Sequence, residues 1–427
     1  MVVVGKQNRI STAFEADGIH HLAEVTLERL VYGGDAVGQL ANGRAVFVPF
    51  GLPGERVSVR LVEEKRDYAR AELVEVLKPS PKRIRPRCTH FTVCGGCAYQ
   101  HLDYAEQLAV KRALLIETLE RVGGIDHPPV EATVPSPLPW YYRNNVQFHL
   151  TPDGKLGFQA SRSHEVVPIL ECHVLEEAIA EVWPLIEVAA VPELTQIGLR
   201  AGAGGEPMLI LEGSSRKPPE FSVDFPLSAV YHGPDGPFVL AGDPFLTIEL
   251  LGRSFRVSPG SFFQVNTAGA AKMVEHLLAS LSLDGAPAIL DAYCGVGLFS
   301  AFLAAQAGRL VGVEVSESAC QDFAANLDEF DHVELYQGSL EDILPVLDFR
   351  PDIVVADPPR SGIARRGLEA ILARGPSTIA YVSCEPPTLA RDLRWMLAHG
   401  YHLEKVTPFD LFPQTYHIES ISILRRG

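Results

Sequence analysis

Strand-like apolar segments alternate with helix-like segments between residues 251 and 427, and this alternation restricts the fold more than any other feature of the sequence. Such alternation is typical of a doubly wound α/β sheet, in which ligands bind at the carboxyl ends of the strands. A chain of 427 residues is too long for one core, so we expect two or three domains. The expected strands of this last domain lie at 253–258, 310–315, 351–357, 379–382 and 418–424, and one more runs from 288 into a glycine loop ending at 297.

Cys384 follows one of these expected strands and precedes two prolines. Pro386 and Pro387 have a fixed φ and no backbone N–H, so the chain must leave the strand there; we expect the next helix to begin at Thr388. Cys384 is therefore expected at the carboxyl end of a strand. A single cysteine is ordinarily a small buried apolar residue, so the local pattern leaves a structural thiol and a reactive thiol both open.

The net charge of −16 argues against a protein that is coated for nucleic-acid binding. The segment 76–102, however, contains no acidic residue. It is either a solvated linker or a local phosphate-binding patch. Its clustered basic residues are Lys78, Lys82, Arg83, Arg85 and Arg87.

No secretory signal or membrane span is expected. Residues 1–17 carry charges and only one short run of valines, and the apolar stretch 292–308 is interrupted by glycines and polar residues. We therefore expect a cytoplasmic protein. The sequence indicates no obligate protein partner.

Residues 18–77 are rich in β-forming residues and turn signals, including Asn42-Gly43. Several short strands in so small a region predict an OB-like barrel, a fold that binds nucleic acids or serves as a structural adaptor. The expected strands cover 22–30, 36–40, 44–49, 55–62 and 68–77.

The next region, 78–250, is predicted to be a central α+β domain that contains a group of cysteines. Cys88, Cys94 and Cys97 have the spacing C-x5-C-x2-C, and Cys172 is a distant fourth candidate. The chain has seven cysteines and no expected secretory signal, which argues for metal or catalytic roles. Four thiolates can bind an iron–sulfur cluster or a zinc ion, and unligated thiols are the third alternative. We also expect helices at 104–122 and 174–190, a linker at 130–139, a hairpin at 140–150 and 155–159, and strands at 194–200, 208–212 and 229–231.

The glycine loop after the strand at 288 admits two nucleotide cofactors. NAD requires a third glycine or alanine where this chain has Ser300. S-adenosylmethionine instead requires acidic residues at successive strand ends, and Asp291, Glu314 and Asp357 fit that pattern. The Asp-Pro-Pro motif that starts at Asp357 also occurs in methyltransferases acting on exocyclic amines, but Arg360 stands where those enzymes usually have an aromatic residue.

Seven motifs occur in this order along the chain: YARA (68–71), RCTHFTVCGGC (87–97), FFQVN (262–266), DAYCGVG (291–297), DPPR (357–360), VSCEPPTLARD (382–392) and HIES (417–420). Taken together, these motifs resemble the RNA uracil-5-methyltransferase family over nearly the whole chain. The resemblance is strongest to the branch that modifies 23S ribosomal RNA and carries a TRAM domain and a 4Fe–4S cluster. It implies a TRAM barrel at 18–77, a cluster-binding α+β region at 78–250 and a Rossmann-like methyltransferase domain at 251–427.

The resemblance also implies roles for individual residues. Cys384 would add to carbon 6 of a uracil, and Glu419 would remove the carbon 5 proton after methylation. The methyl donor would be held by Gln264, Tyr293, Glu314 and Asp357, and the cluster by Cys88, Cys94, Cys97 and Cys172.

Two positions depart from the family. Leu298 replaces a common asparagine, which puts one polar cofactor contact in question, and Glu385 replaces the usual asparagine after the nucleophile.

The expected substrate is RNA, with 23S ribosomal RNA favoured and transfer RNA as the alternative. An amine methyltransferase and a non-catalytic RNA-binding adaptor are the less favoured functions. The target uridine is expected to flip out of its helix or loop, and Phe262 is either a stacking residue or a core aromatic.

Overall fold

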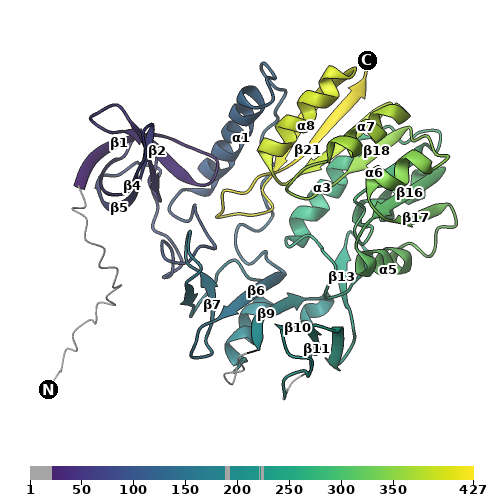
Figure 1. Cartoon of the computed structure of the whole chain (residues 1–427), viewed down its shortest axis with the longest axis horizontal. Helices are drawn as coiled ribbons and strands as arrows, with labels where there is room; N and C mark the ends of the chain where they lie inside the picture. The colour runs from purple at the N-terminus through teal and green to yellow at the C-terminus, as the bar shows by residue number, and fades with distance from the viewer. Residues whose placement is uncertain (1–21, 188–192, 221, 223–225) are drawn as a thin grey trace. The chain divides into compact units, whose positions relative to one another are not determined.

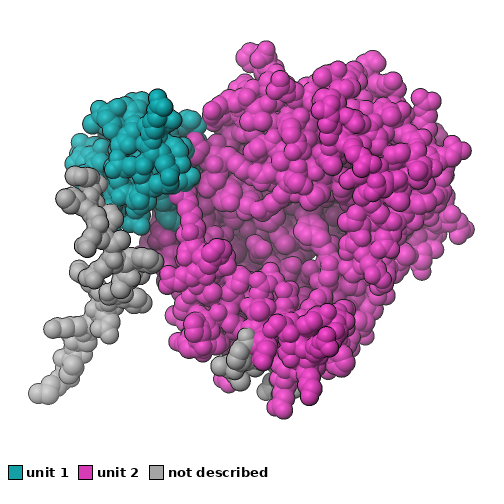
Figure 2. All heavy atoms as spheres, in the orientation of Figure 1, with its two compact units in different colours: residues 1–30, 35–81 teal, residues 31–34, 82–427 magenta. Residues whose placement is uncertain are grey.

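The computed structural model describes residues 22–187, 193–220, 222 and 226–427 (Figure 1). The chain divides into two compact units (Figure 2). Unit 1 consists of residues 1–30 and 35–81, and unit 2 of residues 31–34 and 82–427. The regions 82–250 and 251–427 therefore lie within one unit.

Unit 1 contains a closed five-stranded barrel in the order β1-β2-β3-β5-β4, as the sequence predicts. All neighbouring strands are antiparallel except β3 and β5, which are parallel. Alternate side chains such as Val46, Val48, Val57 and Val59 are fully buried inside it, because successive residues of a strand point to opposite faces. The strands are β1 (Leu22–Leu30), β2 (Asp35–Gln39), β3 (Ala45–Pro49), β4 (Arg56–Glu64) and β5 (Tyr68–Lys78).

The first part of unit 2 contains a seven-stranded sheet in the order β12-β11-β10-β9-β6-β7-β8. The predicted hairpin is present as β6 and β7, but β8 and β12 were not predicted. The expected helix at 174–190 is shorter, and part of that range lies outside the described residues. The elements are β6 (Asn145–Leu150), β7 (Leu156–Gln159), β8 (Val166–Pro168), α2 (Glu177–Val182), η1 (Trp183–Leu185), β9 (Leu194–Ala201), η2 (Ala203–Gly205), β10 (Pro207–Gly213), β11 (Ser228–Gly233) and β12 (Gly236–Ala241).

The last part of unit 2 forms a second seven-stranded sheet, β17-β16-β15-β18-β19-β21-β20. The neighbouring strands β17, β16, β15, β18 and β19 are parallel to one another. Strand β21 is antiparallel to both β19 and β20. The prediction missed β17 and β20. The strands are β15 (Ala288–Ala292), β16 (Arg309–Glu314), β17 (Val333–Gln337), β18 (Ile353–Ala356), β19 (Thr378–Ser383), β20 (Tyr401–Phe409) and β21 (Glu419–Arg426). A separate two-stranded sheet pairs β13 (Leu246–Leu250) with β14 (Arg253–Val257).

Helices cover both faces of this second sheet (Figure 1). Along β18, Ile353 and Val355 enter one apolar core while Val354 enters the other, as expected for a strand buried on both sides. Helices α3, α4 and α5 contribute to the first core, and α1, α6, α7 and α8 to the second. The helices are α1 (Tyr104–Arg121), α3 (Thr267–Ser280), α4 (Leu298–Leu303), η3 (Ala304–Gln306), α5 (Glu317–Asn326), α6 (Leu340–Ile343), η4 (Leu344–Val346), α7 (Arg365–Arg374) and α8 (Pro386–Ala398).

Two local predictions were wrong. The proline-rich segment 130–139 is not a free linker, because Val130 and Val134 form parallel bridges with Val406 and Phe409 of β20. Helix α8 begins at Pro386 rather than at Thr388. A proline fits the first turn of a helix, where its missing N–H would have no partner within the helix.

No helix in the described ranges is long and apolar enough to cross a membrane.

Candidate active site

Cys384 and Glu419 meet at one end of the strand pair β19–β21. Ser383, the last residue of β19, pairs with Ser420, the second residue of β21. Cys384 directly follows Ser383, and Glu419 directly precedes Ser420. Because the strands are antiparallel, both residues lie at the same edge of the sheet. Cys384 is partly exposed, whereas Glu419 is 5% exposed.

The local sequence fixes the position of the Cys384 thiol. The backbone N–H of Glu385 donates a hydrogen bond of 3.2 Å to Ser383 Oγ, and Thr388 Oγ1 donates to the Glu385 carbonyl at 3.0 Å. These bonds close the turn between strand β19 and helix α8, so Cys384 is held at the turn itself.

Carboxyl groups and burial disfavour ionisation of this pair. Burial, with the nearby carboxyl groups of Glu419 and Asp357, raises the pKa of the Cys384 thiol to about 12. Burial and Asp357 also raise the pKa of Glu419 well above its usual range. Arg360 opposes both shifts by placing a positive charge nearby. Sequence reasoning noted Arg360 only as a departure from amine methyltransferases, and its position in the DPPR motif was the available signal.

Three acidic residues predicted at strand ends lie on neighbouring parallel strands. Glu314 ends β16, and Asp357 directly follows β18. Asp291 lies one residue before the end of β15 and is buried. The strand order reverses between β15 and β18, and such a reversal opens a crevice at the carboxyl edge of a sheet. Tyr293 follows β15 in a left-handed conformation with φ 64°.

Backbone N–H groups hold the Glu314 carboxylate in place. Its Oε2 accepts a hydrogen bond of 3.0 Å from Gly295, and its Oε1 accepts bonds of 2.8 Å from both Val315 and Ser316. One acceptor position therefore remains on Oε2, because each carboxylate oxygen offers two lone pairs. That position fits one hydroxyl group of a ribose.

Asp291 has an unused acceptor atom. Its Oδ2 accepts a hydrogen bond of 2.6 Å from Ser300 Oγ, whereas its Oδ1 is buried and has no partner among the described residues. Burial raises the pKa of this carboxyl group to about 7. A buried polar atom without a partner is uncommon and suits a site that binds a polar ligand.

Gln264 lies on a separate loop, 258–266, between β14 and α3. The loop is tied to the first sheet of unit 2 because Asn144 Nδ2 donates to the Gln264 carbonyl at 3.0 Å. The Gln264 side chain makes no hydrogen bond within the described parts of the chain. Phe262 is 66% exposed on the same loop, so it is not a core aromatic.

Two buried charges hold this loop, and sequence reasoning missed both. Asp322 of α5 accepts hydrogen bonds from Ser258 N at 2.7 Å and from Ser261 Oγ at 2.6 Å. Arg200 of β9 donates to the carbonyls of Ser258 at 3.1 Å and Ser261 at 3.0 Å. Asp322 is fully buried and Arg200 is 4% exposed. No sequence motif signals such a pair.

The two departures from the family pattern have different environments. Leu298 is buried at the start of α4 and cannot offer a polar contact. Glu385 accepts a hydrogen bond of 3.1 Å from the Tyr32 hydroxyl, and both residues belong to unit 2.

The four candidate cluster cysteines lie together in unit 2. Burial raises the pKa of Cys97 to about 12, and the thiols of Cys172, Cys94 and Cys88 act on it in the same direction. The backbone N–H of Gly96 points to Cys94 Sγ at 3.4 Å, the contact expected for a glycine next to a cluster ligand. In the described ranges, no group of three or more His, Cys, Asp or Glu side chains is arranged to hold one metal ion. Four cysteine thiolates are the usual ligands of a 4Fe–4S cluster, in which each sulfur binds a different iron atom.

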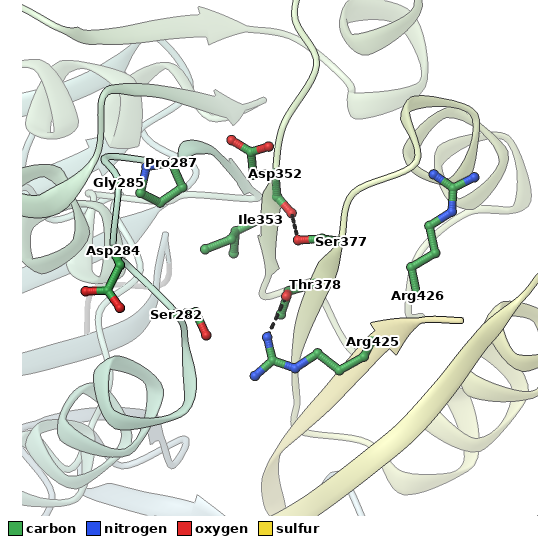
Figure 3. Close-up of a pocket in the computed structure, with 10 residues that line it drawn as sticks. All are labelled: Ser282, Asp284, Gly285, Pro287, Asp352, Ile353, Ser377, Thr378, Arg425 and Arg426. Atoms are coloured by element: carbon green, nitrogen blue, oxygen red, sulfur yellow. Dashed lines mark hydrogen bonds between the residues drawn. The ribbon is translucent and has the colours of Figure 1, made fainter.

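A pocket of about 510 Å³ lies at the opposite edge of the second sheet (Figure 3). Its lining includes Ile353 and Thr378, the first residues of β18 and β19. The polar groups there bind one another. Ser377 Oγ donates to the Asp352 carbonyl at 2.9 Å, and Arg425 donates to Thr378 Oγ1 at 2.6 Å. The pocket is therefore separate from the edge that carries Cys384.

Comparisons with known proteins identify the family to which the chain belongs. The family model described as tRNA (Uracil-5-)-methyltransferase matches residues 245–348 and 338–427, and the TRAM domain model matches residues 23–74. An uncharacterized RNA methyltransferase of Nostoc sp. is 35% identical over 94% of this chain and 96% of its own length. An uncharacterized RNA methyltransferase of Thermotoga maritima is 31% identical over 95% of this chain and 99% of its own length.

A solved structure extends the similarity to the whole fold. The Pyrococcus abyssi tRNA (uracil-54, C5)-methyltransferase in complex with S-adenosyl-L-homocysteine is 27% identical, with a TM-score of 0.73, over 94% of this chain and 100% of that chain. The chain therefore belongs to the S-adenosylmethionine-dependent RNA (uracil-5-)-methyltransferase family and carries a TRAM domain.

Proposed function

We propose that this enzyme transfers a methyl group from S-adenosylmethionine to carbon 5 of one uridine in 23S ribosomal RNA, with Cys384 as nucleophile and Glu419 as base. The observation that carries the proposal is the pairing of Ser383 with Ser420, which brings the two reactive groups to one edge of the sheet. That edge also carries Glu314 and Asp357.

Cys384 would activate the uracil ring. Its thiolate adds to carbon 6, which moves the electron pair of the C5–C6 bond to carbon 5 as an enolate. Carbon 5 can then accept a methyl group. The positive charge of Arg360 favours the thiolate form of Cys384. Because Cys384 is partly exposed, a uracil ring can approach its sulfur.

Glu419 would complete the reaction. It takes the proton from carbon 5, the electrons of that bond re-form the C5–C6 double bond, and the Cys384 sulfur leaves carbon 6 as a thiolate. A buried carboxylate is a stronger base than an exposed one, because burial raises its pKa.

S-adenosylmethionine would be held by Gln264, Tyr293, Glu314 and Asp357. When bound, it supplies an electrophilic methyl group on a positively charged sulfur. The free acceptor position of Glu314 would bind a ribose hydroxyl, and the unbonded side chain of Gln264 is available for a second polar contact.

The target uridine would reach this site by flipping out of its helix or loop. Phe262 would stack on the extruded base or on a neighbour, since its ring is exposed on a loop that Asp322 and Arg200 hold. Cys88, Cys94, Cys97 and Cys172 would bind a 4Fe–4S cluster with a structural role.

Transfer RNA is the second candidate substrate. The specific observation in its favour is the Pyrococcus abyssi enzyme, whose name states a transfer RNA uridine as its target. The C-x5-C-x2-C cysteine group and its resemblance to the ribosomal branch favour ribosomal RNA.

The test is methyl transfer from labelled S-adenosylmethionine to unmodified 23S ribosomal RNA and transfer RNA, followed by nucleoside analysis. We expect label in 5-methyluridine of the ribosomal RNA with the wild type and none with Cys384→Ala. Label only in transfer RNA would replace the substrate and keep the chemistry. Label in a methylated amine, or activity that survives Cys384→Ala, would contradict the mechanism.

A further inference from the structure

We propose that Arg87, Trp140, Tyr141 and His173 form a stacking platform for one unpaired nucleotide of the RNA substrate. This inference rests on the proposed function, because it names how the same enzyme holds its RNA. All four residues lie in unit 2. We call this group the aromatic platform.

The rings and the cation of the platform contact one another directly. The Arg87 guanidinium lies 5.0 Å from the centre of the Tyr141 ring and 5.5 Å from that of Trp140. It also donates a hydrogen bond of 2.7 Å to the Tyr141 hydroxyl. His173 packs edge-on against both rings, at 6.4 Å from Trp140 and 6.3 Å from Tyr141. The group is thus one assembled surface built from three chain segments.

The conformation of Tyr141 indicates a functional position. Its φ of 54° lies in the left-handed region, which costs energy for any residue with a side chain. Its ring is 38% exposed, so burial does not compensate that cost fully. Its backbone N–H donates to the His173 carbonyl at 3.0 Å, and this bond holds the strained conformation. Strain of this kind concentrates at binding sites.

The charge of the surface suits a polyanion. Arg85 and Arg87 are both exposed, and neither forms an ion pair with a carboxylate in the described parts of the chain. Lys82 is paired with Glu106, and Glu171 lies against His173 at 3.2 Å. The Arg87 guanidinium beside the exposed Tyr141 provides both parts of a single-strand site, a cation for phosphate and an aromatic ring for a base.

The chain leads from the platform directly to the candidate active site. Tyr142 donates a hydrogen bond of 3.0 Å to the Pro413 carbonyl, in the segment that precedes Glu419. Asn144 binds the loop of Gln264 and Phe262. A flipped uridine leaves its neighbours without stacking partners, and an aromatic surface can replace the lost stacking. The geometry therefore suits a nucleotide next to the target rather than the target itself.

The experiment measures binding of the full chain to two fluorescein-labelled probes, a short single-stranded oligouridine and a blunt RNA duplex. Tyr141→Ala is expected to weaken binding of the single strand about tenfold, since stacking of one base contributes about 1–3 kcal/mol. Tyr141→Phe keeps the ring and is expected to bind like the wild type. Arg216→Ala, which removes an exposed arginine outside the platform, is the matched control for charge.

Arg87→Ala is expected to weaken binding and to reduce the salt dependence, whereas Tyr141→Ala leaves the salt dependence unchanged. If Tyr141→Ala binds the single strand with wild-type affinity, the proposal is wrong. It is also wrong if the variant loses as much affinity for the duplex as for the single strand. Thermal melting and S-adenosylmethionine binding verify that each variant is folded. Methyl transfer to RNA by the wild type separates the two proposals. If the wild type is active and Tyr141→Ala binds the single strand normally, only the platform proposal is wrong. If the wild type is inactive and the variants show the expected binding losses, only the proposed function is wrong.

Discussion

Cys384 and Glu419 are 35 residues apart in the sequence, yet they flank the residue pair Ser383–Ser420 at one end of two antiparallel strands. The carboxyl group lies close enough to oppose ionisation of the thiol. A nucleophile and a base in this relation can act in turn on the two carbons of one double bond, carbon 6 and carbon 5 of a uracil.

Glu419→Gln is expected to stop the reaction after methyl transfer. Without a base the carbon 5 proton stays, so the Cys384–carbon 6 bond cannot break, and turnover falls by about 100-fold or more. Methyl-labelled RNA should then migrate with the protein on a denaturing gel. The double variant with Cys384→Ala is the control and should show no such band. Normal turnover in Glu419→Gln would exclude Glu419 as the base.

Glu419 should also make stability depend on pH. Burial raises its pKa well above its usual range, so the folded protein keeps this proton at pH values where the unfolded chain, with a carboxyl pKa of about 4.3, has lost it. This contribution to stability is complete below the unfolded-chain pKa of about 4.3, and it is lost as the pH rises through the folded-state pKa. Glu419→Gln should therefore raise the melting temperature relative to the wild type at alkaline pH but not at acidic pH. If the difference in melting temperature between Glu419→Gln and the wild type is the same at every pH, the pKa of Glu419 is not raised in the folded protein.

The Cys384 thiol should react slowly at neutral pH in the absence of cofactor. Its pKa of about 12 means that the thiolate fraction rises about tenfold per pH unit through the neutral and alkaline range. Iodoacetamide labelling, followed residue by residue by mass spectrometry, measures this rate. Glu385→Gln removes a nearby negative charge and should speed the labelling, whereas Arg360→Ala should slow it. A plateau near neutral pH would show that the thiol is already ionised.

Asp322→Asn should loosen the loop that carries Gln264. The amide cannot accept all the hydrogen bonds that the carboxylate accepts, and each buried donor left without a partner costs about 1–3 kcal/mol of unfolding free energy. The KM for S-adenosylmethionine should rise more than kcat falls. Asp328→Asn, an exposed position close by, should change stability by less than about 0.5 kcal/mol. A stable variant with wild-type KM would contradict the role of Asp322.

The cysteine group should contain iron after anaerobic purification. A 4Fe–4S cluster predicts about four iron and four sulfide ions per chain and broad visible absorption. Cys172→Ser should lose the iron, and Cys320→Ser, which changes a buried cysteine of α5, should keep it. Zinc in place of iron would favour the zinc alternative, and no metal with all thiols titratable would favour unligated thiols.

The sequence determined much of the local structure. Period-two alternation and the Asn42-Gly43 turn predicted the barrel strands to within about two residues, because both signals act between neighbours. The strand–turn–helix units around Asp291 and Cys384 were recognisable for the same reason. Helix α8 was predicted to begin two residues later than it does, because sequence patterns define element boundaries poorly. Strand β20 was not predicted at all.

Only the tertiary structure decided which distant residues meet. Sequence gave no reason to place Glu419 beside Cys384 except the family resemblance, since the pairing depends on strand β21 running antiparallel to β19. The same is true of Asp322 and Arg200, which bind one loop from two distant segments, and of Arg87 with Tyr141. Local propensity acts over a few residues, whereas register and side-chain contacts between distant segments follow from the packing of the whole unit.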